Sequence, residues 1–238
     1  MRAIYLEGLK ELSKASVLKI EGERAHHLLS VARIKVGEDL FLFNGKGLKL
    51  KASVIEVRKK DLSVNVLEVL KEEKSNLLFD VAICLPKKNA FDEIIKISVE
   101  LGLDSIIPIN SEYSTRHILN KERIHRVLES ALIQSNNPFL PDFKDPISLK
   151  GLKEISEGYD KIFYFSSIKK ESGVNLNSDQ EKNKVLLIIG PEGGLSPFEE
   201  KFLNGLEKIQ TVHLPTPILR SPHALATSVG YLLGCYQK

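Results

Sequence analysis

The chain has 238 residues, of which 42% are hydrophobic and 27% are charged, and its formal net charge is +3. This composition is typical of a globular protein, and the length suits one or two domains that each bury a core. No apolar run approaches the length of a membrane span, and the first residues lack the apolar segment of a signal peptide. We therefore expect a cytoplasmic protein with no membrane partner.

The two cysteines and the distribution of charge indicate little about the function of the protein. Cys84 and Cys235 lie in apolar stretches far apart in the sequence, so we expect buried free thiols and neither a metal nor a redox pair. Residues 1–74 carry 15 Lys and Arg against 11 Asp and Glu, whereas residues 75–238 carry 19 against 20. The N-terminal excess suits a phosphate backbone, although a solvated surface explains it about as often.

Residues 1–72 are predicted to form a small β-barrel, because short strand patterns follow one another with one helical turn between them. Asn44-Gly45-Lys46-Gly47 is a strong hairpin turn. Residues 62–70 alternate apolar and polar side chains, as a half-buried strand does. The expected strands are residues 2–6, 16–20, 39–43, 48–58 and 62–70, and the expected helical turn is residues 25–33.

Beyond a charged linker at residues 71–76, strand and helix patterns alternate, which predicts βα units and a parallel sheet. We therefore expect two domains, residues 1–72 and residues 73–238. The strands of the second domain are expected at residues 79–85, 106–109, 162–165, 185–189 and 211–214. Its helices are expected at residues 94–101, 121–134, 147–156, 196–206 and 222–236.

The buried strand at residues 185–189 runs into G-P-E-G-G at residues 190–194, and S-P-F-E at residues 196–199 then predicts a capped helix start. A strand, a glycine turn and a helix in this order are typical of a cofactor loop in an open α/β sheet, although an ordinary tight connection remains the alternative. The loop is neither G-x-G-x-x-G nor a Walker loop. Its carboxylate would repel a phosphate, so a cationic or neutral ligand suits it better.

A second stretch, L-P-T-P-I-L-R-S-P-H at residues 214–223, is a proline-rich loop that enters the last predicted helix. We expect Ser221 to cap this helix and Pro222 to lie in its first turn.

Together these stretches resemble a known family. I-I-G-P-E-G-G-L-S at residues 188–196, followed about thirty residues later by I-L-R-S at residues 218–221, is similar to the SPOUT methyltransferases. More narrowly it resembles the RsmE type, which methylates N3 of a uridine in the decoding region of 16S ribosomal RNA. The resemblance covers nearly the whole chain. It implies S-adenosylmethionine as cofactor, a PUA-like RNA-binding barrel before a SPOUT α/β domain, a C-terminal trefoil knot and a homodimer.

Methyl transfer from a sulfonium depends mainly on orientation and the exclusion of water. We expect three loop ends to meet and bind the methyl donor largely through backbone groups. The expected cofactor-binding residues are Phe165, Ser166, Ile189, Gly190, Glu192, Gly193, Gly194, Leu214, Ile218, Leu219 and Ser221.

The acceptor that the family implies, uridine N3–H, must lose its proton, so a base or a cation that stabilises the uridylate oxygens is required. Arg220 is the candidate for the second role, and Glu192 could face the ribose or the sulfonium. A buried Arg220 paired with a carboxylate such as Glu192 is the structural alternative. His223 could accept a proton, but a histidine near a helix start is more often a surface or capping residue.

His27, Arg33 and Gly37 stand where the family's barrel has an H…R…G pattern. The residues expected to contact RNA in the small ribosomal subunit are Arg2, His27, Arg33, Lys87 and Lys88. Arg33 could instead interact with the helix macrodipole. No metal site is expected.

The chain departs from the family pattern at Ile97, Tyr113, Pro217 and Pro222, so it resembles a divergent member. Two alternatives therefore stay open. One is a non-catalytic rRNA-binding protein that keeps the fold. The other is a SPOUT methyltransferase that acts on a ribose 2′-hydroxyl or on tRNA.

Overall fold

The computed structural model describes residues 2–116, 118–166 and 183–236, and the chain divides into two compact units. The N-terminal unit comprises Met1–Lys74 together with Leu132–Leu140, and the C-terminal unit comprises Ser75–Ala131 together with Pro141–Lys238. The division therefore does not fall at a single point of the chain, because a short segment after residue 131 packs with the N-terminal strands.

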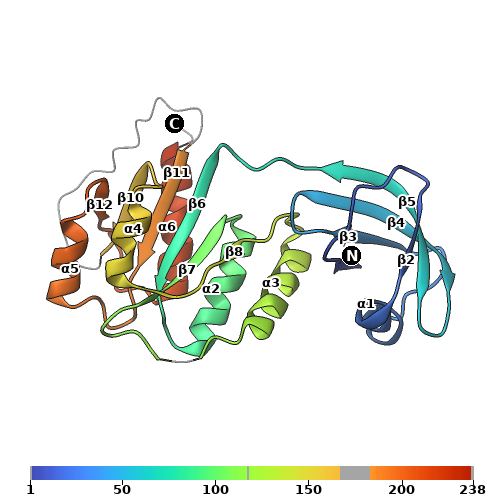
Figure 1. Ribbon diagram of the computed structural model, residues 1–238, viewed down its shortest axis with the longest axis horizontal. Helices are drawn as coiled ribbons and strands as arrows, with labels where there is room; N and C mark the ends of the chain where they lie inside the picture. The colour runs from blue at the N-terminus through green and yellow to red at the C-terminus, as the bar shows by residue number, and fades with distance from the viewer. Residues whose placement is uncertain (1, 117, 167–182, 237–238) are drawn as a thin grey trace. The chain divides into compact units, whose positions relative to one another are not determined.

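The N-terminal unit is built on one five-stranded sheet in the order β1-β3-β4-β5-β2 (Figure 1). β1 pairs with β3 in parallel, and the other neighbours pair antiparallel. The alternation predicted for β5 is confirmed, since Leu62, Val64 and Val66 are fully buried in the core of this unit. The strands are β1 (Ala3–Tyr5), β2 (Val17–Ile20), β3 (Asp39–Phe43), β4 (Leu48–Val57) and β5 (Leu62–Lys71).

The expected helical turn begins earlier than predicted. It consists of α1 (Gly22–His26) and a π-helical turn, η1 (His27–Val31). The chain leaves it through Arg33, whose φ of 49° is left-handed, and Ile34 N–H then donates to the carbonyl of Leu28 at 3.0 Å. Such a left-handed exit is a common way to end a helix.

The turn between β3 and β4 requires glycine at Gly47. The Asn44 side-chain oxygen accepts hydrogen bonds from the N–H groups of Lys46 and Leu48, which fixes the turn. Gly47 has φ of 94°, and a Cβ there would lie 2.5 Å from the carbonyl oxygen of Glu72 and 2.8 Å from the ring of Phe139. Neither the backbone conformation nor the space admits a side chain.

The C-terminal unit contains a parallel sheet in the order β12-β10-β11-β6-β7-β8, and β9 also pairs with β7. The predicted parallel sheet is confirmed. Its central strands are buried on both faces, which explains their unbroken apolar sequences. The strands are β6 (Leu77–Cys84), β7 (Ser105–Asn110), β8 (Asp142–Phe143), β9 (Ile147–Ser148), β10 (Lys161–Phe165), β11 (Asn183–Ile189) and β12 (Ile209–Val212).

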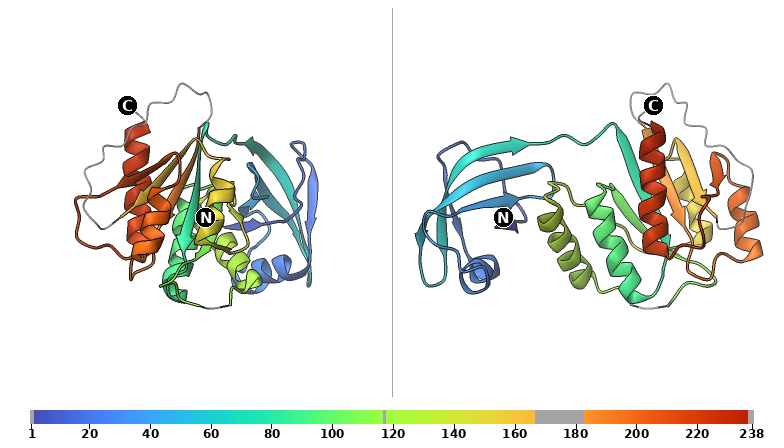
Figure 2. Two further views of the ribbon diagram at one scale, coloured as in Figure 1. Left: turned by 60° about the vertical axis from the view of Figure 1, so that its left-hand side comes forward. Right: turned by 180° about the vertical axis from the view of Figure 1, so that it is seen from behind.

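Helices cover both faces of this sheet. α4 and α5 lie on one face, where Leu152 and Leu203 join its core, and α2 and α6 lie on the other (Figures 1 and 2). Across the described ranges, no helix is long and apolar enough to cross a membrane. The helices are α2 (Lys88–Glu100), α3 (Lys121–Ser135), η2 (Leu149–Gly151, a 3₁₀ turn), α4 (Leu152–Ser156), α5 (Pro197–Asn204) and α6 (Ser221–Tyr236).

Two predictions for the C-terminal unit were wrong in detail. Residues 147–156 are not one helix, because Ile147 pairs with Ile109 at the free edge of β7 and Ser148 then caps η2. The last strand covers Ile209–Val212 and not residues 211–214, because Ile209 pairs with Ile162 of β10. In both cases pairing with a distant strand sets the boundary, which local sequence does not show.

We expect Gly47→Ala to destabilise the chain more than Gly37→Ala does, although both glycines have left-handed backbone (94° and 87°). A Cβ at Gly37 meets nothing within 4 Å, so that substitution should cost about 1–2 kcal/mol of backbone strain. Gly47→Ala should cost a further 1–3 kcal/mol or so, because its Cβ overlaps backbone and ring atoms. Urea unfolding measures both, and equal losses would contradict the close packing of this turn.

Candidate functional site

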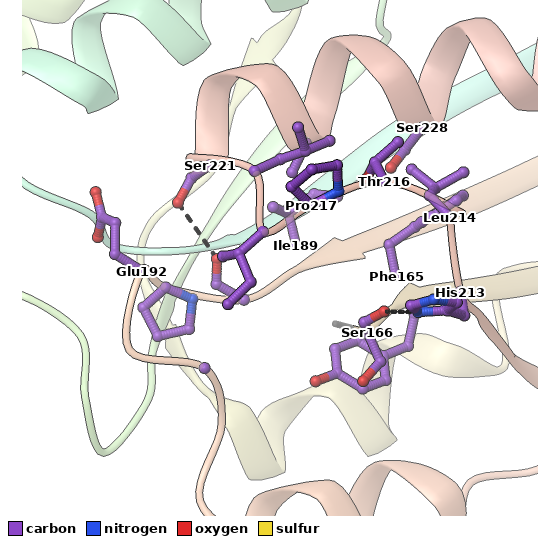
Figure 3. A pocket seen from close by; sticks show the side chains of 17 residues that line it. Phe165, Ser166, Ile189, Glu192, His213, Leu214, Thr216, Pro217, Ser221 and Ser228 are labelled. Carbon is purple, nitrogen blue, oxygen red and sulfur yellow. Dashed lines mark hydrogen bonds between the residues drawn. The ribbon is translucent and has the colours of Figure 1, made fainter. Parts of the chain in front are cut away.

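The candidate site lies where three neighbouring parallel strands end. Phe165, the last residue of β10, pairs with Ile189 of β11 on one side and with Val212 of β12 on the other. Because parallel strands end at the same edge of a sheet, the segments that follow them converge there. A pocket opens between these segments and the start of α6 (Figure 3). The structure thus brings together the two special stretches of the sequence.

All of the predicted cofactor residues except Gly193 line this pocket. Gly193 is not among the described lining residues, and a Cβ added there would lie 3.5 Å from Cβ of Tyr113. Tyr113 belongs to the loop after β7 and is 51% exposed.

Hydrogen bonds tie the three converging segments to one another. The Ser221 hydroxyl donates to the carbonyl oxygen of Gly190 at 3.5 Å (Figure 3), which links the start of α6 to the glycine loop. Ser166 N–H donates to the carbonyl of Val212 at 3.0 Å, and Nδ1 of His213 lies 3.4 Å from the Ser166 carbonyl oxygen. The pocket walls are therefore joined by one bond between main-chain groups and by two contacts from side chains to main-chain carbonyls.

Ser221 does not act as the helix cap that the sequence predicted. It is the first residue of α6, and the helix begins with a hydrogen bond from Ala224 N–H to the Arg220 carbonyl at 2.8 Å. The Ser221 hydroxyl instead donates to the Gly190 carbonyl. Local sequence could not predict this bond, because folding brings the two residues together.

The glycine loop itself is a tight turn followed by a capped helix, as predicted. Gly194 N–H donates to the Pro191 carbonyl at 2.9 Å, and Gly194 has a left-handed φ of 74°. Ser196 and Glu199 form the expected capping box of α5. The second carboxylate oxygen of Glu199 accepts the N–H of Glu112 at 2.8 Å, so the same side chain also anchors the loop that carries Tyr113.

The expected alternative of a buried pair between Arg220 and Glu192 is wrong. The Arg220 side chain is 63% exposed, and its Nη2 lies 4.0 Å from a carboxylate oxygen of Glu93 on α2. Glu192 is exposed in the pocket lining, and His223 is also exposed. Arg220 does not itself line the pocket, although Leu219 and Ser221 on either side of it do.

The pocket is close to neutral. Glu192 is the only acidic residue among the described lining residues, and no Lys or Arg is among them. Burial raises the pKa of Tyr164, whose hydroxyl donates to the Glu200 carboxylate at 3.3 Å, so this phenol stays uncharged. Apolar walls, main-chain groups and one carboxylate suit a neutral or cationic ligand with an apolar part.

Sequence reasoning missed several lining residues. His213 directly follows β12, so its place was detectable once the strand boundary was known. Ala224 and Ser228 follow Ser221 on the same face of α6, and helical spacing could have indicated them. Tyr164 was also missed, whereas Pro191, Thr216 and Pro217 lie within the loop segments 189–194 and 214–221 that were expected to bind the donor.

The predicted RNA-binding residues belong to both units. In the N-terminal unit, Arg2 forms an ion pair with Glu38, while His27 and Arg33 are exposed at the π-helical turn and its left-handed exit. In the C-terminal unit, Lys87 and Lys88 are exposed at the start of α2.

The cysteines are free thiols, but only Cys84 is buried as expected, since Cys235 is half-buried. Burial raises the pKa of the Cys84 thiol to about 12, so it is a neutral thiol at physiological pH. Cys84 is thus a packed core residue and not an activated nucleophile.

Comparison with known proteins bears on both units. Residues 73–233 match the model of an RNA methyltransferase domain, and residues 20–67 match that of an RNA methyltransferase PUA domain. Ribosomal RNA small subunit methyltransferase E of Rickettsia conorii is 26% identical, over 98% of this chain and 96% of the relative.

Solved structures show the same fold. A Legionella pneumophila protein in complex with SAM has a TM-score of 0.82 and 25% identity, over 98% of this chain and 97% of that one. Ribosomal RNA small subunit methyltransferase E from Neisseria gonorrhoeae has a TM-score of 0.83 and 23% identity, over 99% of this chain and 98% of that one. The expected PUA-like domain and SPOUT α/β fold are confirmed.

We expect Glu199→Ala to destabilise the chain by roughly 2 kcal/mol, because the N–H groups of Ser196 and Glu112 both lose their acceptor. Ser196→Ala removes one capping bond and should cost roughly 1 kcal/mol. Lys201→Ala, at an exposed position of α5, is the control. Urea unfolding of the three variants tests this; a Glu199→Ala loss no larger than that of Ser196→Ala would rule out the second anchor.

Proposed function

Because the chain belongs to the RNA methyltransferase family, we propose that it transfers a methyl group from S-adenosylmethionine to small-subunit ribosomal RNA. The finer proposal is methylation of uridine N3 in the decoding region of 16S ribosomal RNA. The observation that carries the proposal is the near-neutral pocket formed by the glycine loop and the segment before α6. Relatives named for small-subunit ribosomal RNA methylation, which match the chain nearly end to end, support the substrate.

The pocket fits this cofactor. S-adenosylmethionine combines a purine nucleoside with a cationic sulfonium, and the pocket offers apolar walls, main-chain groups and a single carboxylate. Residues of the glycine loop and of the segment 213–221 would hold it, largely through the backbone. When bound, the cofactor supplies a methyl group activated by a positively charged sulfur. Glu192, the only acidic lining residue among those described, complements that charge.

Arg220 is proposed as the residue that acts on the acceptor. Uridine N3 becomes a nucleophile only when its proton leaves, and the resulting negative charge spreads over the neighbouring ring oxygens. An exposed guanidinium between two lining residues can donate hydrogen bonds to those oxygens without being sequestered in a buried pair. Orientation and the exclusion of water by the pocket walls supply the rest.

We propose that residues 1–72 bind RNA and that residues 73–238 carry the methyltransferase site. The exposed His27 and Arg33 and the basic excess of residues 1–74 support the first part. We also propose that Arg2, Lys87 and Lys88 contact the RNA. The proposed enzyme is cytoplasmic and works where ribosomes are assembled.

The proposed enzyme is a homodimer with a C-terminal trefoil knot. The chain path supports the knot: after β12 at the edge of the sheet, residues 213–221 return past the end of β11, and α6 then packs against α2 and β11. Tyr231, a large side chain of α6 that is 39% exposed, supports a helix face available to a second copy.

Mass spectrometry of RNA from a strain that lacks the gene tests the function. We expect one N3-methyluridine to be missing from 16S ribosomal RNA and to return when the wild-type chain is supplied. Loss of a ribose methyl group or of a tRNA methyl group would instead show that the enzyme has a different target. RNA with unchanged methylation would contradict the proposal.

We expect Arg220→Ala to bind S-adenosylmethionine about as well as the wild type but to methylate RNA about 100-fold more slowly, the usual loss for one stabilising donor. Glu93→Ala is the matched control, because it removes the ion-pair partner and leaves the guanidinium in place. Calorimetry and a methyl-transfer assay separate the two effects, and near-normal turnover by Arg220→Ala would show that its assigned role is wrong.

A further inference from the structure

Ser228 is a pocket residue without an evident structural task. It lies on α6 one turn after Ala224, and both residues line the pocket. The side chain is fully buried, and Figure 3 shows it directed from α6 toward the pocket. Its hydroxyl oxygen has no hydrogen-bond partner among the residues that the structure describes.

A buried helical serine normally satisfies its hydroxyl within the helix, and this chain contains the comparison. Ser98 on α2 is equally buried, and its hydroxyl donates to the carbonyl of Ile94, four residues earlier, at 2.8 Å. The Ser228 hydroxyl makes no such bond to a described residue. A buried polar group left without a partner is destabilising, and such groups are rare in native proteins unless water or another molecule satisfies them.

The surroundings of Ser228 indicate which part of a ligand it meets. Figure 3 shows Phe165 and Leu214 on the same side of the pocket as Ser228, whereas Glu192 and Ser221 lie toward the other side. This side of the pocket combines apolar side chains with a few polar groups, among them Thr216 and His213, and such a lining suits a flat ring that carries nitrogen atoms on its edge. The charged amino-acid part of the cofactor would not be solvated there.

We propose that the Ser228 hydroxyl hydrogen-bonds the purine edge of S-adenosylmethionine and so contributes to recognition of its adenosine part. The inference rests on the proposed function, since it concerns the same pocket. On this proposal the ligand supplies the hydrogen-bond partner of Ser228. This explains why the Ser228 hydroxyl has no partner among the described residues of the protein without ligand.

Calorimetric titration with S-adenosylhomocysteine, the demethylated cofactor, tests this. Ser228→Ala should weaken binding about threefold to tenfold, the range of one neutral hydrogen bond. The melting temperature of the unliganded variant should be unchanged or higher, because a buried unpaired hydroxyl has been removed. Unchanged affinity would overturn the inference.

Ser98→Ala is the matched control and should behave in the opposite way. It loses an internal hydrogen bond, so its melting temperature should fall while its affinity for S-adenosylhomocysteine stays at the wild-type value. If Ser228→Ala also lowered the melting temperature and left affinity intact, Ser228 would be a structural residue and the inference would be wrong.

A second ligand locates the contact. 5′-Methylthioadenosine keeps the adenosine but lacks the amino-acid part, so Ser228→Ala should weaken its binding by the same factor. A loss confined to S-adenosylhomocysteine would place Ser228 against the amino-acid part and overturn the purine assignment. If the wild type binds neither ligand, the proposed function fails as well, whereas wild-type binding with no effect of Ser228→Ala defeats this inference alone.

Discussion

The parallel pairing of β10 with β11 and β12 is the constraint on which the site depends. The carboxyl ends of neighbouring parallel strands lie side by side, so the loops that follow these strands also lie close together. The glycine loop follows the middle of the sheet and residues 213–221 follow its edge strand. The second loop must therefore return toward the first, and the bond from Ser221 to Gly190 marks the point where they meet.

The character of the site follows from this construction. Its walls are loop segments joined by hydrogen bonds from main-chain groups and from the side chains of Ser221 and His213, and its described lining contains no Lys or Arg. Such a pocket can hold and orient a ligand and exclude water from it. Cys84 is nearby in the sheet but stays protonated. Orientation contributes much of the rate of a transfer reaction between two bound partners, and the exposed Arg220 is the cation proposed to act on the acceptor.

Much of this could be predicted from the sequence, because the relevant signals are local. The apolar run before the glycine loop, the capping box of α5 and the turn at Asn44–Gly47 each depend on neighbouring residues, and the structure shows all three. The misses have a different origin. The strand at Ile147 depends on the free edge of β7, and the hydroxyl of Ser221 finds Gly190 only after the chain has folded.

The site residues divide in the same way. The glycine loop could be identified from its composition, whereas the contact of the exposed Arg220 with Glu93 of α2, far away in sequence, could not. Ser228 looked like any small residue of an apolar helix, and only the structure shows that its hydroxyl is unpaired among the described residues. Residues that act through long-range contacts give no local signal, so the pattern of the sequence cannot identify them.

Amide hydrogen exchange of the full chain, with and without S-adenosylmethionine, tests the central claim most directly, because the pocket is proposed to hold its ligand through the backbone. Saturating cofactor should slow exchange at residues 189–194 and 213–224 and leave β3, β4 and β5 unchanged. Unaltered exchange in both loops, or protection confined to the N-terminal strands, would contradict the account.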